Sequence, residues 1–412
     1  MGDTPLSRSL ELCVKTINLK AIYRFEGYVV KELRCEENAA QIKLDFDKRS
    51  GPRCPDCRVK LPRNKIGQGC AMDLSIADVS CVYIIYPRIQ GHCHDCRTYV
   101  TTRPAEIHPT KEATWRLMRE VSSWASVAPA SAVAVMFELS EATVRRYDQE
   151  VLKAQLPPPE LDNLRCILID EKYLGKSHGF VTVVLNGDTG ELLHMARGKK
   201  KESLESFFEK LSDTQRDAIE VAGIDRAGAY QSVVEQWLPE CSIVYDRFHL
   251  VRNVNDAVDK VRRSEWRAAD KNGKKVIKSS RYLLLANPEN LDESGLDRLQ
   301  RLRDANDAIS TAYLLSEQFR AIYYYKREGW AMRALFAWCD LADSSGLEPF
   351  QRLARGFRKQ CSRITSYIKH KVTSGRIEGF NSQISKIIQR ACGIANLDYL
   401  FLRLRHQSVM RI

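Results

Sequence analysis

The sequence predicts a multidomain α+β protein, and three observations carry this prediction. Two Cys-x-x-Cys pairs lie in a β-rich segment near the start of the chain. A stretch with helical periodicity follows, from Thr114 to Leu152. Beyond the proline run at 156–160, strand-like and helix-like segments alternate. The 412 residues, of which 44% are hydrophobic, leave room for about two to four domains, each with its own core.

The composition excludes some classes of protein. The chain has no run of about 18 uninterrupted apolar residues, so we expect no membrane span. Its first residues lack the pattern of a secretory signal. The 13 cysteines, an odd number in a chain without such a signal, favour reduced thiols in a cytosol. Seven scattered cysteines are expected mostly to be small buried hydrophobes: Cys13, Cys35, Cys166, Cys241, Cys339, Cys361 and Cys392.

The positive charge is concentrated at the C-terminal end. The net charge is +12, and the segment from Gln351 to Ile412 holds 13 Lys/Arg against the two acids Glu378 and Asp398. A basic face of this kind binds a polyanion such as nucleic acid, or it is only a solvated surface. The charge alone does not decide between these interpretations.

The two Cys-x-x-Cys pairs predict a zinc ribbon. Cys54 and Cys57 form the first pair, and Cys93 and Cys96 form the second. Four thiolates suit tetrahedral Zn²⁺, and a closed site of four cysteines is structural, not catalytic. A redox dithiol and a set of thiols without metal are the alternatives. Four nearby side chains could replace a ligand: Cys70, Cys81, His92 and His94.

The segment from Thr114 to Leu152 predicts a helix-turn-helix. A first helix precedes a short one over Ala130–Phe137, and Ser140 then provides an N-cap for a third. The third helix would enter the major groove of DNA. It would offer Glu141, Thr143, Arg145 and Arg146 as contact residues. An ordinary helical hairpin is the competing interpretation.

Two acids follow apolar strands in the next part of the chain. We expect strands over 164–170, 180–185, 192–196, 219–225 and 242–246, with helices over 204–211 and 230–237. The first and fourth strands would lie side by side, so Asp170 and Asp225 would meet at one sheet edge. A strand that simply exits into solvent can also end in an acid. Asp246 ends the fifth strand and could replace Asp225 as a ligand, but we favour Asp225.

A third acid candidate, Glu378, lies in the segment Thr373-Ser-Gly-Arg-Ile-Glu-Gly-Phe-Asn381, which reads as part of a helix. Glu378 and Asn381 share one helix face, and Lys386 and Arg390 continue a basic edge that could hold a DNA backbone. Three clustered carboxylates repel one another, and Mg²⁺ or Mn²⁺ removes that conflict. Two such ions support phosphoryl displacement, in which water cuts a strand and a DNA hydroxyl joins one.

These residues together resemble the DDE transposases of bacterial insertion sequences, most closely the ISL-three group. The likeness covers nearly the whole chain, from the cysteine ribbon through Ser140-Glu-Ala-Thr-Val-Arg-Arg146 to Ala391-Cys-Gly-Ile. Its more specific strings are Asp246-Arg-Phe-His249 and Glu378-Gly-Phe-Asn381. The ribbon and the helix-turn-helix are not specific by themselves.

The resemblance implies the remaining expectations. The chain would have an RNase H-like catalytic domain, depend on Mg²⁺, and carry Asp170, Asp225 and Glu378 as catalytic ligands. It would bind the terminal inverted repeats of a mobile element and target DNA, as a homo-oligomer on paired ends, in the bacterial cytoplasm at the nucleoid. We accordingly expect a zinc-ribbon domain (1–108), a helix-turn-helix domain (109–158), a catalytic domain in two parts (159–254 and 368–412) and a helical insertion (255–367).

One departure and two rival functions remain. Ribbons often have Gly directly after a Cys-x-x-Cys pair, where this chain has Arg58 and Arg97. His249 either orients a phosphate or carboxylate, or it is a packed core residue. A transposase-derived DNA-binding regulator without catalysis is the first rival function, and the intact acid triad disfavours it. A nuclease that only hydrolyses is the second, and the same acids would serve it.

Overall fold

The computed structural model describes residues 24–410 except 37, 50, 62–64, 77–78, 177, 226–228, 374 and 395. The chain divides into two compact units, residues 1–156 with 390–392 and residues 157–389 with 393–412. Cys13 lies outside the described residues. Within the described part, no helix is long and apolar enough to cross a membrane.

The described part of the first unit contains a five-stranded sheet in the order β1-β2-β4-β3, with β5 paired to β4. Strands β2 and β4 are parallel, and the other neighbours are antiparallel. Alternate side chains of β2 and β4, such as Ile42, Val82 and Ile84, are buried in one cluster, as expected for a sheet with one covered face. The strands are β1 (Tyr28–Glu36), β2 (Ala39–Phe46), β3 (Lys65–Asp73), β4 (Cys81–Cys93) and β5 (Thr98–Thr101).

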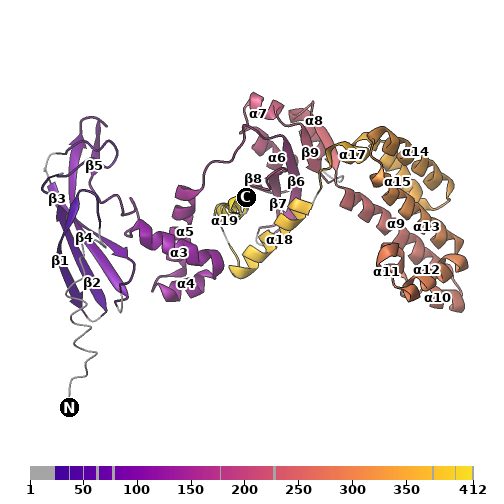
Figure 1. Ribbon diagram of the computed structural model, residues 1–412, viewed down its shortest axis with the longest axis horizontal. Coiled ribbons are helices and arrows are strands. Elements are labelled where there is room, and N and C mark those ends of the chain that lie inside the picture. Colours follow the sequence, from indigo (N-terminus) through magenta and orange to yellow (C-terminus); the bar gives the residue numbers. More distant parts are fainter. Residues whose placement is uncertain are drawn as a thin grey trace, which may run out of the picture. The chain divides into compact units, whose positions relative to one another are not determined.

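Three helices follow the sheet in the described part of the first unit (Figure 1): α3 (Trp115–Val127), α4 (Ala130–Met136) and α5 (Glu141–Gln155). Asp73 at the end of β3 accepts hydrogen bonds from the Thr114 hydroxyl at 2.6 Å and from Arg116 at 2.7 Å. This buried carboxylate therefore ties the start of α3 to the sheet. The Ser140 hydroxyl accepts from the backbone N–H of Thr143, so the predicted N-cap of the third helix is confirmed.

The second unit contains a five-stranded sheet in the order β10-β9-β6-β7-β8. Strands β6, β7 and β8 are antiparallel neighbours, while β6, β9 and β10 are parallel. The predicted pairing of the first and fourth strands is therefore confirmed. The strands are β6 (Cys166–Tyr173), β7 (Phe180–Asn186), β8 (Leu192–Arg197), β9 (Val221–Ile224) and β10 (Ser242–Tyr245).

The two faces of this sheet have different partners. Ile167 and Ile169 of β6 belong to the large core that also contains Leu204 of α6 (Lys201–Phe208) and Val233 of α8 (Tyr230–Trp237). On the alternate positions, Cys166 packs with Val221 and Val244, together with Tyr367 and Val372 from late in the chain. The short helix α7 (Asp213–Asp217) precedes β9.

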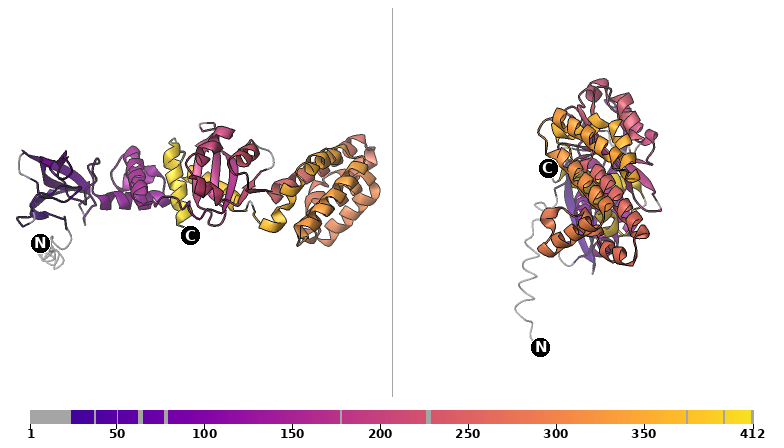
Figure 2. Two further views of the ribbon diagram at one scale, coloured as in Figure 1. Left: turned by 90° about the horizontal axis from the view of Figure 1, so that it is seen from above. Right: turned by 90° about the vertical axis from the view of Figure 1, so that its right-hand side faces the viewer.

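A set of helices separates β10 from the last part of the chain, and the orange helices stay together in every view (Figures 1 and 2). Their core is aromatic: Phe319 lies 5.2 Å from both Trp338 and Phe357, measured between ring centroids. The helices are α9 (Arg247–Ala268), α10 (Lys271–Ile277), α11 (Arg281–Leu285), η1 (Pro288–Asn290), α12 (Glu293–Ala305), α13 (Asp307–Ala321), η2 (Ile322–Tyr324), α14 (Glu328–Ser344), α15 (Glu348–Arg358), α16 (Cys361–Thr365) and α17 (Tyr367–His370).

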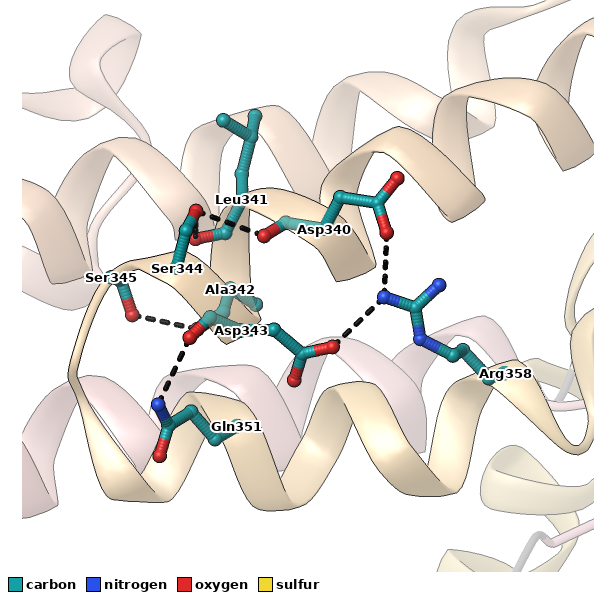
Figure 3. Close-up of polar contacts among 8 residues, drawn as sticks. All are labelled: Asp340, Leu341, Ala342, Asp343, Ser344, Ser345, Gln351 and Arg358. Carbon is teal, nitrogen blue, oxygen red and sulfur yellow. Dashed lines mark hydrogen bonds and ion pairs between the residues drawn. The ribbon is translucent and has the colours of Figure 1, made fainter.

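Polar contacts fasten the turn between α14 and α15 (Figure 3). The Arg358 guanidinium donates to Asp340 at 2.6 Å and to Asp343 at 2.8 Å, and these carboxylates raise its pKa. The Gln351 side chain donates to the backbone oxygen of Asp343 at 2.9 Å. One arginine thus holds the last turn of α14 against the end of α15.

The chain then returns to the second sheet with α18 (Gly375–Arg390) and α19 (Leu397–Val409). Helix α19 is fastened by a buried ion pair, because Arg405 donates to Glu191 at 3.0 Å beside β8. Both side chains are less than one-tenth exposed, so loss of either partner would leave an uncompensated buried charge.

Two sequence-based expectations need correction. Strand β6 does not end at Asp170 but continues to Tyr173, because β7 pairs with it over that whole length. Cys35 and Cys392 are exposed, whereas Cys166, Cys339 and Cys361 are buried as expected. Cys35 lies near the end of β1 and Cys392 lies just beyond the end of α18, where the local apolar pattern gives no information about burial.

Candidate active site

Three aspartates lie in one row across adjacent strands. The pairing of β6 with β9 reaches Leu168 opposite Gly223, and Asp170 and Asp225 each lie two residues beyond that pair. Strands β9 and β10 end with Ile224 opposite Tyr245, so Asp225 and Asp246 each follow by one residue. Side chains at equal register point to the same face of a parallel sheet. The sheet register therefore gathers Asp170, Asp225 and Asp246 at one edge.

A narrow cavity of about 20 Å³ lies at this edge, enough for one water-sized or ion-sized occupant. Asp170, Asp225, Asp246 and His249 all line it. Its remaining lining comes from apolar residues of the three strands and from the approach to α18, namely Leu168, Ile169, Gly223, Ile224, Val244, Val372, Thr373 and Ile377.

His249 links two of the acids. Its Nδ1 lies 2.6 Å from an oxygen of Asp246, and its Nε2 lies 4.0 Å from an oxygen of Asp225. Asp246 also caps α9, since it accepts from the backbone N–H groups of Phe248 and His249. The hydrogen bond to Asp246 raises the pKa of His249, and the charge of Asp225 adds to that effect. A protonated His249 would balance part of the negative charge of the row.

Asp170 is held by α18. The Asn381 amide donates to a carboxylate oxygen of Asp170 at 2.7 Å, and the backbone N–H of Glu171 donates at 2.8 Å. Burial raises the pKa of Asp170, while these two hydrogen bonds oppose the shift. The amide of Asn381 therefore fixes the orientation of a carboxylate whose proton affinity is increased by its surroundings.

Glu378 lies in the first turn of α18, three residues before Asn381, and it is exposed. It is not among the residues that line the narrow cavity, although its neighbour Ile377 is. The structure thus brings together Asp170, Asp225, Asp246, His249 and Asn381. The role of Glu378 as the third ligand stays a prediction.

Gly223 is a residue of this site that sequence reasoning missed. A Cβ atom there would lie 2.7 Å from Leu168 and 3.0 Å from Val372. Only glycine lets the segment before α18 approach the strands so closely. A glycine inside an apolar strand, two residues before an acid, was the available signal, because such glycines often mark a close approach of other chain segments.

The four predicted zinc ligands are assembled in the first unit. The sulfur atoms of Cys54, Cys57, Cys93 and Cys96 all lie within 4.8 Å of one another. Two of the sulfur pairs are separated by 3.8 and 3.3 Å, and a tetrahedral zinc–thiolate site needs roughly 3.8 Å. Across the described parts of the chain, this is the only such group of three or more Cys, His, Asp or Glu residues.

The thiols of this cluster differ in acidity. The backbone N–H of Cys96 lowers the pKa of Cys93 to about 7, whereas the adjacent Cys57 thiol raises the pKa of Cys96. Both turns carry an arginine in the left-handed conformation, with φ of 64° at Arg58 and 52° at Arg97. The sharp turns that glycine usually makes are therefore present, and arginine adopts them.

The predicted DNA-contact residues lie on helix surfaces. Arg146 is exposed and donates to the Thr143 hydroxyl at 3.0 Å, while Arg145 pairs with Glu141 at 2.7 Å. Lys386 and Arg390 are exposed on α18. These positions agree with a surface role.

Comparison with known proteins places the chain in a family. A sequence profile described as transposase, of the ISL-three DDE type, matches residues 167–404. The transposase for insertion sequence element IS1001 of Bordetella parapertussis is 30% identical over 399 residues, which covers 94% of this chain and 97% of that protein. The transposase for insertion sequence element IS1557 of two Mycobacterium tuberculosis strains, CDC 1551 / Oshkosh and H37Rv, is 29% identical over 254 residues, or 56% of this chain and 57% of that protein. The chain therefore belongs to the ISL-three family of DDE transposases.

Proposed function

We propose that this transposase cuts and joins DNA by metal-dependent phosphoryl displacement at the edge where Asp170 and Asp225 meet. The observation that carries the proposal is the row of aspartates at equal register on β6, β9 and β10. Carboxylate oxygens are the ligands that Mg²⁺ prefers, and a small cavity lined by several of them fits one such ion. Glu378 would supply a further carboxylate from α18.

The residues present have defined tasks in such a reaction. Asn381 orients Asp170, and the Asp246–His249 pair sets the charge beside Asp225. Mg²⁺ or Mn²⁺, when bound, would polarise the scissile phosphate and the attacking oxygen. The acids must be ionised to hold a cation, so a bound cation would oppose the upward shift that burial gives to the pKa of Asp170.

We further propose the domain roles that the family likeness implies. The strand order of the second sheet supports an RNase H-like catalytic domain, split by the helical insertion. A structural zinc in the cysteine cluster would stabilise the first unit. The capped helix α5 would read the terminal inverted repeats of the mobile element through Thr143, Arg145 and Arg146. Lys386 and Arg390 would contact the DNA backbone, with the protein acting as a homo-oligomer on paired ends and then on target DNA.

The test is cleavage of a duplex made from the inverted repeats that flank the gene, with Mg²⁺ present. The wild type should cut, and Asp170→Asn, Asp225→Asn and Glu378→Gln should not. Glu209→Gln, an exposed carboxylate on the end of α6, is the matched control and should cut as the wild type does. Equal cutting by an acid variant would remove that acid from the site.

The two rival functions have distinct outcomes. A regulator without catalysis would bind the duplex with the wild-type protein and leave it uncut. A nuclease would cut, but it would give no target-linked product when pre-cut ends and a plasmid are supplied. The family assignment favours strand joining, because transposases move DNA segments.

A further inference from the structure

The outer face of helix α14 carries large apolar side chains that the rest of the insertion does not cover. Trp330 is 54% exposed, Phe336 is 42% exposed and Leu341 is 49% exposed, whereas Leu335 and Trp338 on the opposite side of the helix are buried in the core. In the described chain, no other helix or strand exposes three large apolar side chains. Single exposed apolar residues are ordinary, but several on one face are typical of an interaction surface.

Five exposed residues lie in a line along this face. Trp330, Arg333, Ala337, Asp340 and Ser344 follow one another at alternating steps of three and four residues. This spacing keeps side chains on one side of a helix and is the spacing by which two helices pack along one seam. Ala337 is the midpoint of the line, with Trp330 and Ser344 each about two turns away.

The two halves of the line carry opposite charge. Arg333 has no carboxylate partner among the described residues, and its guanidinium lies over the indole ring of the same helix. Asp340 and Asp343 share the single guanidinium of Arg358, so one negative charge is left over after Ala337. The line is therefore positive before its midpoint and negative after it.

The two ends of the line also differ in size. Trp330 is the largest side chain of the line, and Ser344 at the other end is small. The Ser344 hydroxyl donates to the backbone oxygens of Asp340 at 2.9 Å and of Leu341 at 3.1 Å in its own helix (Figure 3). An aromatic ring can therefore cover Ser344 without leaving a polar group unpaired. A face that is complementary to itself in charge and size suits a two-fold contact between identical chains.

We propose that the outer face of α14 binds the same face of a second copy of this chain, with the two helices antiparallel and crossing at Ala337. Each Trp330 would cover Ser344 of the other copy, and each Arg333 would meet Asp340 of the other copy. The inference rests on the proposed function, in which the protein acts as a homo-oligomer on paired ends. One helix pair is smaller than a standard interface, so we expect dissociation in the micromolar range, which paired DNA ends would strengthen.

The first experiment measures the molar mass of the full-length protein by sedimentation equilibrium over a range of micromolar concentrations. The wild type should dimerise, and Leu341→Glu should raise the dissociation constant at least about tenfold, because the contact would bury an unpaired charge. Leu296→Glu is the matched control, since Leu296 is a 42% exposed leucine of α12 outside this face. That variant should dimerise as the wild type does, and equal midpoints of thermal unfolding would show that both variants are folded.

The second experiment exchanges the charges of the line. Arg333→Asp and Asp340→Arg should each weaken the dimer, because like charges would then face one another twice. The double variant should regain the wild-type dissociation constant. A mixture of the two single variants should form heterodimers, since opposite charges meet at both positions only in the mixed pair. Arg358 keeps Asp343 as its partner in Asp340→Arg, so the turn after α14 stays fastened.

The outcomes separate this inference from the proposed function. A wild type that stays monomeric at every concentration overturns the α14 contact, and so does a dimer that Leu341→Glu and both charge variants leave unchanged. If such a protein still cuts and joins the inverted repeats, the catalytic proposal stands. A wild type that pairs through α14 but cuts no DNA supports the contact and contradicts the catalytic proposal. Weak dimers of both single variants without rescue in the double variant or the mixture would overturn the antiparallel two-fold arrangement.

Discussion

The four cysteines of the first unit lie close enough for one ion, whereas the acids of the second unit lie along a sheet edge and a separate helix. The cysteines come from two Cys-x-x-Cys turns, and each turn fixes the geometry of its two ligands within four residues. The acids come from three strands and from α18, which follows them by more than a hundred residues. One site is formed by local turns and the other by sheet register and long-range packing.

This difference concerns stability as well as geometry. When the four thiolates of the cysteine cluster bind an ion, the free energy of metal binding contributes to the free energy of folding. The aspartate row is held by the sheet, by Asn381 and by His249, and its like charges oppose one another without a cation. We expect loss of a cysteine ligand to harm the fold and loss of an acid to harm only the reaction.

Removal of zinc should have the largest effect. Cys93→Ser, or a strong chelator, should unfold the region around the cysteine cluster. Structural zinc sites contribute about 10–16 kcal/mol of binding free energy to the folding of small domains. Hydrogen exchange would show lost protection in β4 and β5 and unchanged protection in the second sheet. Cys70→Ser is the control, because that thiol is exposed and outside the cluster. A Cys93→Ser protein with full zinc and full protection would refute the structural role.

Replacement of one acid should leave the fold intact and abolish the reaction. Asp170→Asn should lower the rate of DNA cutting by at least about a thousandfold, because several kcal/mol of charge stabilisation are lost. The midpoint of thermal unfolding without metal should stay equal or rise, since one like charge is gone. A fall of that midpoint by several degrees would show that the acid row supports the fold after all.

The same contrast explains what could be predicted from the sequence. The knuckle ligands, the Ser140 cap and the strand order follow from local patterns and from the rule that neighbouring parallel strands share an edge. The end of β6 could not be located, because its partner β7 extends the strand beyond Asp170. The sequence favoured Asp225 over Asp246 as a metal ligand, because strand order shows only which strands are neighbours. The register of the strands places all three acids in one row, and register could not be predicted. The position of Glu378 depends on packing after a long helical insertion, which no local pattern reveals.

Acid should weaken the second unit through His194. Burial lowers the pKa of this histidine of β8 to about 4, so it is neutral in the folded state. The contribution of neutral His194 to the free energy of unfolding is complete above the ordinary pKa of about 6.5. This contribution is lost as the pH falls toward 4, and the total loss is about 3 kcal/mol. Denaturant unfolding of the second unit from pH 7 to 4 should show this loss, and His194→Gln should flatten it. An unchanged slope in the variant would assign the effect to other groups.

The smallest effect concerns the arginine that directly follows the second Cys-x-x-Cys pair. Arg97 is exposed and has a φ of 52°, a conformation that costs an L-residue about 1–2 kcal/mol and glycine very little. Arg97→Gly should therefore stabilise the zinc-loaded first unit by about 1 kcal/mol in denaturant unfolding. Arg88→Gly is the matched control, since Arg88 is an exposed residue of strand β4 and the same change there should destabilise by a similar amount. If both changes destabilise, the Arg97 side chain contributes more to the free energy of unfolding than its backbone conformation costs. A direct interaction of Arg97 with phosphate would then be the next property to measure.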